Sequence, residues 1–127
     1  MIEINNISSF SVDKKFFSGV AKKVLKGENK EIKNLSIAFV KAEEIKKLNK
    51  KYRQKNKPTD VLSFNLDEGS YLGEVVICPE MVKDDVGMAR VLIHGILHLF
   101  GYDHEKTKKE KRLMEKKEKY YLSLINF

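Results

Sequence analysis

Cysteine is almost missing from this chain of 127 residues, since Cys78 is the only one. A single cysteine excludes an internal disulfide. Cys78 ends an apolar run that begins at Val75, so we expect a buried and chemically inert thiol. This use of cysteine agrees with a reducing cytosol.

The sequence also has no long hydrophobic run. No apolar stretch approaches the roughly 20 residues of a membrane-spanning helix, and residues 1–10 lack a basic segment followed by an apolar one. We therefore expect a soluble, unexported, cytoplasmic protein. A chain of this length with 42% hydrophobic residues suits one compact domain over residues 1–127.

Arginine is scarce as well, because Arg53, Arg90 and Arg112 are the only ones, yet lysine gives the chain a formal net charge of +7. A positive charge of this size favours polyanionic partners. The densest basic segment, residues 106–119, is typical of the solvated face of a helix. Net charge alone therefore does not identify a partner.

Histidine, by contrast, is concentrated in one place, at His94, His98 and His104. Two histidines four residues apart on a helix project from the same face. Gly101 can take the left-handed conformation that ends a helix, so His104 can fold back toward the other two. Three neutral imidazoles suit Zn²⁺, with a water or substrate oxygen as the fourth ligand. The alternative is that these are ordinary helix and turn residues.

The same spacing occurs in metzincin proteases, whose general base is a glutamate directly after the first histidine. In this chain that position is Gly95, which disfavours peptide hydrolysis. A Zn²⁺ ion with three uncharged ligands keeps its full charge, lowers the pKa of bound water and attracts anions such as phosphodiesters. The pattern therefore favours phosphoryl chemistry.

Hydrophobic periodicity predicts an α+β fold. We expect a single domain with a small mixed sheet of about four strands, about four to five helices, and a metal site at the end of a buried helix. The predicted strands are residues 1–7, 35–40, 61–64 and 75–78, the last two forming a hairpin. The predicted helices are residues 16–25, 42–52, 86–100 and a last one whose docking stripe is Leu113, Met114, Tyr120, Tyr121, Leu124 and Ile125.

Two long motifs resemble the YbeY family of bacterial endoribonucleases and rRNA maturation factors. The first is His94-Gly-Ile-Leu-His-Leu-Phe-Gly-Tyr-Asp-His104, and the second is Arg53 followed by Lys57-Pro-Thr-Asp-Val-Leu-Ser-Phe64. Gly73-Glu-Val-Val-Ile-Cys78 and Met114-Glu115 also correspond. The resemblance spans roughly residues 35 to 120, and a chance match to both long motifs is very improbable.

This resemblance implies that His94, His98 and His104 bind one Zn²⁺ per chain and that Arg53 is functionally important. It also implies action on single-stranded RNA, in particular maturation of the 3′ end of 16S rRNA in the small ribosomal subunit, and a part in ribosome quality control. Ribosomal proteins or the ribosome are further expected partners, whereas DNA and membranes are not. A guanidinium such as that of Arg53 can hold two phosphate oxygens at once.

The proton acceptor is left open by the sequence. Asp103 and Glu74 are candidates, but Asp103 can equally orient a ligand histidine and Glu74 can be a surface strand residue. The segment between Cys78 and the first histidine is shorter than is usual in the family, which affects one wall of the cleft. Asn65 stands where proline is common, and we expect this to alter only the end of a strand.

Two other functions compete with a nuclease. One is a ribosome-assembly factor that binds rRNA or a ribosomal protein and uses zinc only to hold a helix end. The other is a metal-dependent hydrolase of small molecules, whose activity should be indifferent to Arg53 and to the lysine-rich surface. Strong salt dependence of RNA affinity would favour either RNA function over it.

Overall fold

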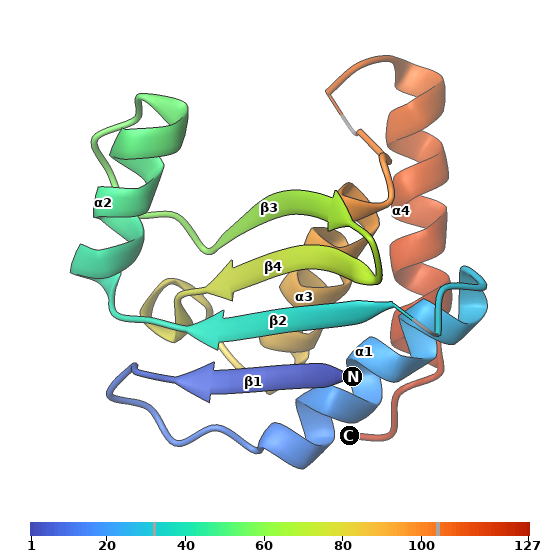
Figure 1. Cartoon of the computed structure of the whole chain (residues 1–127), viewed down its shortest axis with the longest axis horizontal. Coiled ribbons are helices and arrows are strands. Elements are labelled where there is room, and N and C mark those ends of the chain that lie inside the picture. Colours follow the sequence, from blue (N-terminus) through green and yellow to red (C-terminus); the bar gives the residue numbers. More distant parts are fainter. Residues whose placement is uncertain (32, 104) are drawn as a thin grey trace.

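The computed structural model describes residues 1–31, 33–103 and 105–127 (Figure 1). Within these ranges, four α-helices and four strands follow the predicted order, with one short 3-10 helix after the last strand. The elements are β1 (Ile2–Asn6), α1 (Lys14–Gly27), β2 (Asn34–Phe39), α2 (Ala42–Arg53), β3 (Val61–Glu68), β4 (Tyr71–Ile77), η1 (Pro79–Met81), α3 (Asp85–Leu99) and α4 (Lys108–Ser123).

The four strands form one mixed sheet in the order β1-β2-β4-β3. β1 pairs with β2 and β2 with β4 in parallel, whereas β3 and β4 form an antiparallel hairpin. The predicted hairpin and the predicted α+β class are therefore confirmed. Because α1 connects two adjacent parallel strands, it crosses over one face of the sheet, as such connections require (Figure 1).

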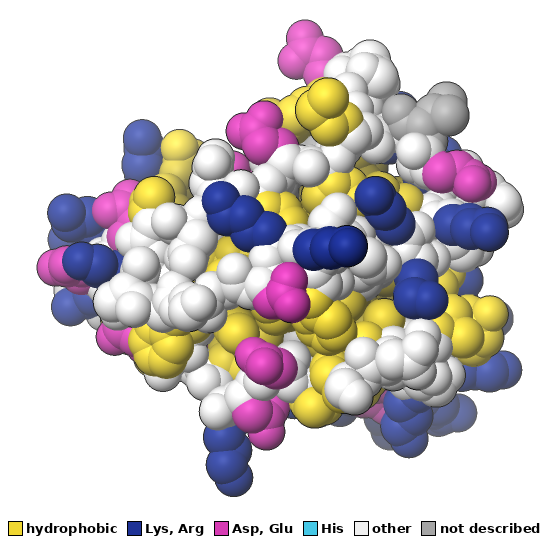
Figure 2. Space-filling view, turned by 90° about the horizontal axis from the view of Figure 1, so that it is seen from below, with side chains coloured by type: hydrophobic (Ala, Val, Ile, Leu, Met, Phe, Trp, Pro, Cys, Tyr) yellow, Lys and Arg dark blue, Asp and Glu magenta, His cyan; other side chains and the backbone are white. Residues whose placement is uncertain are grey.

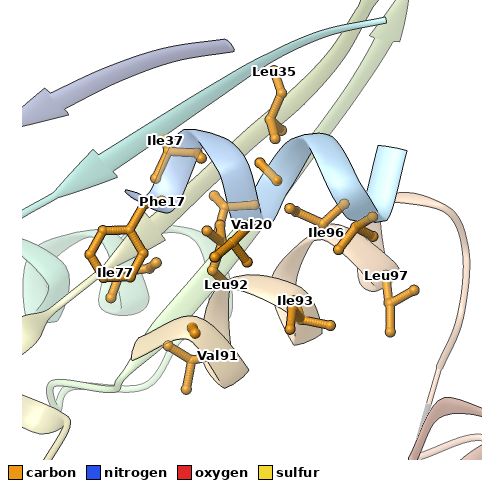
Figure 3. Packing of buried hydrophobic residues seen from close by; sticks show 14 of the residues in the cluster. Phe17, Val20, Leu35, Ile37, Ile77, Val91, Leu92, Ile93, Ile96 and Leu97 are labelled. Atoms are coloured by element: carbon orange, nitrogen blue, oxygen red, sulfur yellow. The ribbon is translucent and has the colours of Figure 1, made fainter. Parts of the chain in front are cut away.

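The helices α1 and α3 pack together on that face and build the main core (Figure 3). Phe17 and Val20 of α1 meet Leu92 and Ile96 of α3, and all four side chains are at most 1% exposed. The helix α4 packs against α3 in turn. The helix with His94 and His98 is therefore enclosed by the core, as its apolar sequence predicts.

At one end, α2 packs on the other face of the sheet through a separate and smaller cluster. Its buried members are Val40, Ile45, Leu62, Val76 and Cys78. Tyr52 of α2 also meets Phe64 of β3 edge-on, with ring centroids 5.1 Å apart. The prediction of a buried thiol is confirmed, and burial raises the pKa of Cys78.

The predicted docking stripe of α4 is wrong in part. Met114 and Tyr121 are buried, but Leu113, Tyr120 and Leu124 are 44%, 57% and 39% exposed. A helix that docks along one narrow line buries residues spaced by about seven and leaves the neighbours on either side in solvent.

Basic side chains are spread widely over the surface. On the face seen in Figure 2, lysine and arginine side chains surround patches of hydrophobic and acidic ones. Positive charge is therefore not confined to one groove. Within the described part of the chain, no helix combines the length and apolar character needed to cross a membrane.

Candidate functional site

His94 and His98 lie one turn apart on α3, and both side chains are half-buried. Their rings meet edge-on with centroids 4.6 Å apart, and their Nε2 atoms are 3.1 Å apart. The sequence predicts this arrangement from the four-residue spacing. Two imidazole nitrogens therefore converge at the edge of a buried helix.

The end of α3 follows the predicted turn. Gly101 has φ +94°, its N–H donates to the carbonyl of His98 at 3.0 Å, and the N–H of Tyr102 donates to the carbonyl of Leu97 at 3.2 Å. These bonds satisfy the last carbonyls of the helix. His104, the third predicted ligand, follows two positions after Tyr102 and lies outside the described residues.

Gly95 shows why no glutamate follows the first histidine. A Cβ atom at this position would lie 2.7 Å from Cγ1 of Val75 and 3.0 Å from Oγ of Ser63. The Ser63 hydroxyl also donates to the Gly95 carbonyl at 2.8 Å. Because α3 lies this close to the sheet, a side chain cannot fit at this position, and a proton acceptor has to come from another position.

The second ring nitrogen of His94 faces a different helix. Its Nδ1 contacts the carboxylate of Glu118 on α4. Glu118 lies four residues after Met114 and three before Tyr121, the two buried residues of α4, so it belongs to the docking line of that helix. The two ring nitrogens of His94 therefore face a carboxylate and His98.

This geometry fits Zn²⁺ as far as the described residues reach. Two nitrogens bound at 2.0–2.1 Å to one tetrahedral zinc lie about 3.3 Å apart, close to the observed 3.1 Å between the Nε2 atoms. Among the described residues no three histidine, cysteine or carboxylate side chains gather around one point. A complete site thus needs a further ligand, the position that the sequence assigns to His104.

An open cleft of about 300 Å³ lies in front of the two histidines. One wall carries three cationic side chains, and the other is formed by the first residues of β3. The cleft therefore combines imidazoles, positive charge and two carboxylates. Its lining residues are Asn49, Arg53, Lys55, Lys57, Thr59, Asp60, Val61, Leu62, Ser63, His94, His98 and Glu105.

Arg53 reaches this cleft because it is the last residue of α2. Gln54 then turns the chain with φ 56°. Buried Asn49 holds the segment that follows. Its side-chain amide donates to the carbonyl of Lys57 at 2.9 Å, and its backbone carbonyl accepts from the N–H of Lys55 at 3.3 Å. One asparagine therefore fixes the basic loop beside Arg53.

Two smaller hollows continue the cleft past each histidine. One is lined by His98, Arg53 and Tyr102 among others, and the other by His94, Arg90 and Glu118 among others. Both share residues with the central cleft. A long molecule can therefore extend in two directions from the histidine pair, with an arginine on each side.

The two predicted proton acceptors lie in different places. Asp103 lines the hollow that contains Arg53 and His98, and its carboxylate accepts from the N–H of Glu105 at 2.9 Å. Glu74 follows the alternation of β4 to the face opposite Val75, away from α3. Partial burial, with a smaller contribution from the charge of Glu3, raises the pKa of Glu74. The structure thus does not bring Glu74 to the histidines.

Sequence reasoning missed several residues of the site. Asp60 lines the central cleft and one adjoining hollow, although it stands in the motif that resembles the family and could have been singled out there. Glu118 could have been found by its helical spacing from Met114. The expectation for Asn65 is wrong, because it lies inside β3 and its amide donates to the carbonyl of Leu99 at 2.9 Å.

A polar cluster behind the site ties the turn after α3 to two helices. Tyr102 and Lys117 donate to the carboxylate of Glu28 at 2.7 and 3.0 Å, and Tyr121 donates to it as well. Burial alone would raise the pKa of Glu28, but these hydrogen bonds and the charge of Lys117 outweigh burial and hold it below its usual value. Gly27 leaves room for the ring of Tyr121.

Comparisons with known proteins match most of this chain to one family. Residues 3–126 match the model of a family described as Endoribonuclease YbeY. A protein of that name from Persephonella marina is 40% identical, over 82% of this chain and 78% of its own length. One from Buchnera aphidicola is 36% identical, over 99% and 88%. The solution structure of a Thermotoga maritima protein has a TM-score of 0.65 and 34% identity, covering 96% of this chain and 87% of that one.

Proposed function

Since the chain belongs to the Endoribonuclease YbeY family, we propose that it is a zinc-dependent endoribonuclease specific for single-stranded RNA. We further propose that it acts in the cytoplasm on the 3′ end of 16S rRNA and in ribosome quality control. The observation that carries the proposal is the meeting of His94, His98 and Arg53 in one open cleft.

The residues of the cleft have different roles in phosphodiester hydrolysis. When bound, Zn²⁺ supplies a Lewis acid and lowers the pKa of a bound water. Arg53 binds the scissile phosphate in bidentate fashion, and Lys55 and Lys57 hold the neighbouring backbone charge. His94, His98 and, by its position in the sequence, His104 hold the metal.

A proton acceptor is still needed, because Gly95 offers none. Asp103 remains a candidate, since it shares a hollow with Arg53 and His98. Asp60 is a second candidate, since it lines the cleft together with both histidines. Glu74 is not proposed for this role because it lies on the other face of the sheet.

A second candidate function is a ribosome-assembly factor that binds RNA without cutting it and holds zinc structurally. The lysine and arginine side chains spread outside the cleft favour this reading (Figure 2). It predicts RNA binding that weakens steeply with salt but no cleavage by the purified protein.

The test compares the native chain with His98→Ala and with Arg112→Ala, an exposed arginine on α4 that lies outside the cleft. Zinc content and cleavage of a single-stranded RNA ending in the 16S rRNA 3′ sequence are measured on the same preparations. The proposal expects native protein and Arg112→Ala to hold zinc and cut, and His98→Ala to do neither. Full cleavage by His98→Ala would reject it.

A further inference from the structure

The carboxylate of Glu118 occupies an unusual place for a charged side chain. It lies on the docking line of α4, between buried Met114 and Tyr121, and its side chain is only 17% exposed. Every other acidic residue of α4 is fully on the solvent side or at its start. Burying a carboxylate costs free energy unless it is paired, and the contact with His94 provides a partner for Glu118 at this position.

That contact determines which nitrogen of His94 carries the proton. A carboxylate oxygen accepts hydrogen bonds, so the geometry assigns the donor role to the Nδ1 atom that contacts Glu118. In the neutral imidazole the other nitrogen, Nε2, then carries the lone pair. This Nε2 is the atom that lies 3.1 Å from Nε2 of His98.

The arrangement thus prepares His94 as a ligand before any metal arrives. A histidine whose second nitrogen donates to a carboxylate is held in one tautomer and one ring orientation, and its basicity toward a metal rises. The partner comes from α4, which packs on α3 through the main core, so the carboxylate is carried by a fixed element.

We propose that Glu118 is a positioning residue that sets the Zn²⁺ affinity of the site through the tautomer of His94. This inference rests on the proposed zinc site and adds to it a determinant on a different helix. It also assigns a role to α4, whose sequence is otherwise typical of a solvated, lysine-rich helix.

The test measures Zn²⁺ affinity of the metal-free full chain by competition with a chromophoric chelator. Glu118→Ala should weaken affinity by about 100-fold and Glu118→Gln by about 10-fold, because glutamine still offers an oxygen to Nδ1 but no charge. Glu115→Gln, three residues earlier on the same helix and exposed, is the matched control and should bind as the native chain does.

A second readout separates positioning from simple helix docking. Long-range ¹H–¹⁵N spectra of the metal-free protein should show His94 protonated at Nδ1 in the native chain and as a mixture of tautomers in Glu118→Ala. Glu118→Gln, with the same shape, covers the case in which the alanine variant does not fold. Native affinity in both Glu118 variants, or an unchanged His94 tautomer in Glu118→Ala, would overturn the inference.

His98→Ala serves as the reference for the site itself. If His98→Ala loses zinc while both Glu118 variants bind it as tightly as the native chain, the inference fails and the zinc site stands. If His98→Ala still binds zinc with native affinity, the proposed zinc site fails, and the role of Glu118 falls with it.

Discussion

His94 and Arg53 line the same cleft, but the helices that carry them are anchored very differently. Nine of the 15 residues of α3 are buried, whereas only Ile45 and Asn49 are buried among the 12 of α2. The helix α3 belongs to the main core, and α2 rests on a small separate cluster. The side of the cleft that carries His94 and His98 is therefore rigid, and the side that carries Arg53 can lose its packing separately.

The largest expected effect comes from Ile93→Ala in α3, whose side chain is fully buried. Removing these atoms from the main core should cost about 3 kcal/mol of unfolding free energy, measured by urea denaturation. Ile45→Ala removes the same atoms from the small cluster. Because this cluster can open without global unfolding, we expect a smaller loss of unfolding free energy but a clear loss of RNA cleavage. An equal loss of unfolding free energy in both variants would contradict the comparison.

Glu28→Gln tests the polar cluster on the rigid side, with an expected cost of about 2 kcal/mol at neutral pH. Because the folded pKa of Glu28 is lowered, its contribution is complete above the ordinary glutamate pKa and is lost as pH falls through the folded value. The difference in stability between native chain and variant should therefore shrink in acid. A difference that grows toward low pH would refute this sign.

Asn49→Ala tests the anchor on the α2 side. It leaves the carbonyl of Lys57 without the amide that the structure provides, at a cost of roughly 1–2 kcal/mol. We expect RNA cleavage to fall about 10-fold through misplaced Arg53, a loss of roughly 1.4 kcal/mol in transition-state stabilisation, while zinc content is unchanged. Asn5→Ala, an exposed asparagine on β1, is the control. Zinc loss in Asn49→Ala would show that the two sides are not separable.

The smallest effect is expected for Thr107→Ala at the start of α4. The Thr107 hydroxyl accepts from the N–H of Glu110 at 3.1 Å and caps the helix. Its loss should lower stability by about 1 kcal/mol in thermal unfolding, without changing zinc content, because the buried residues of α4 lie further along. A cost near zero would mean that docking alone holds α4.

Local patterns were sufficient to predict the fold and part of the site. The four-residue histidine spacing predicts that His94 and His98 share a helix face, and Gly101 predicts the turn that ends α3. Alternation and turn residues predict the β3–β4 hairpin. Each of these signals acts over a few residues, so no knowledge of tertiary packing was needed.

What the sequence did not reveal depends on which surfaces meet. The alternation of β4 puts Glu74 on one face, but only the packing of α3 shows that this is the face away from the histidines. Asn65 and Glu118 make contacts 34 and 24 residues away along the chain. Tertiary contacts of this kind leave no local period to detect.

The measurement that matters most is zinc content and RNA cleavage of Arg53→Ala beside the native chain, from identical purifications. The account predicts one zinc per chain in both proteins and cleavage reduced at least about 100-fold in the variant, the usual loss when one charge-stabilising donor is removed. Equal cleavage by both proteins would contradict the phosphate role of Arg53 and point to a contaminating nuclease. Loss of zinc in Arg53→Ala would contradict the separation of the two sides of the cleft.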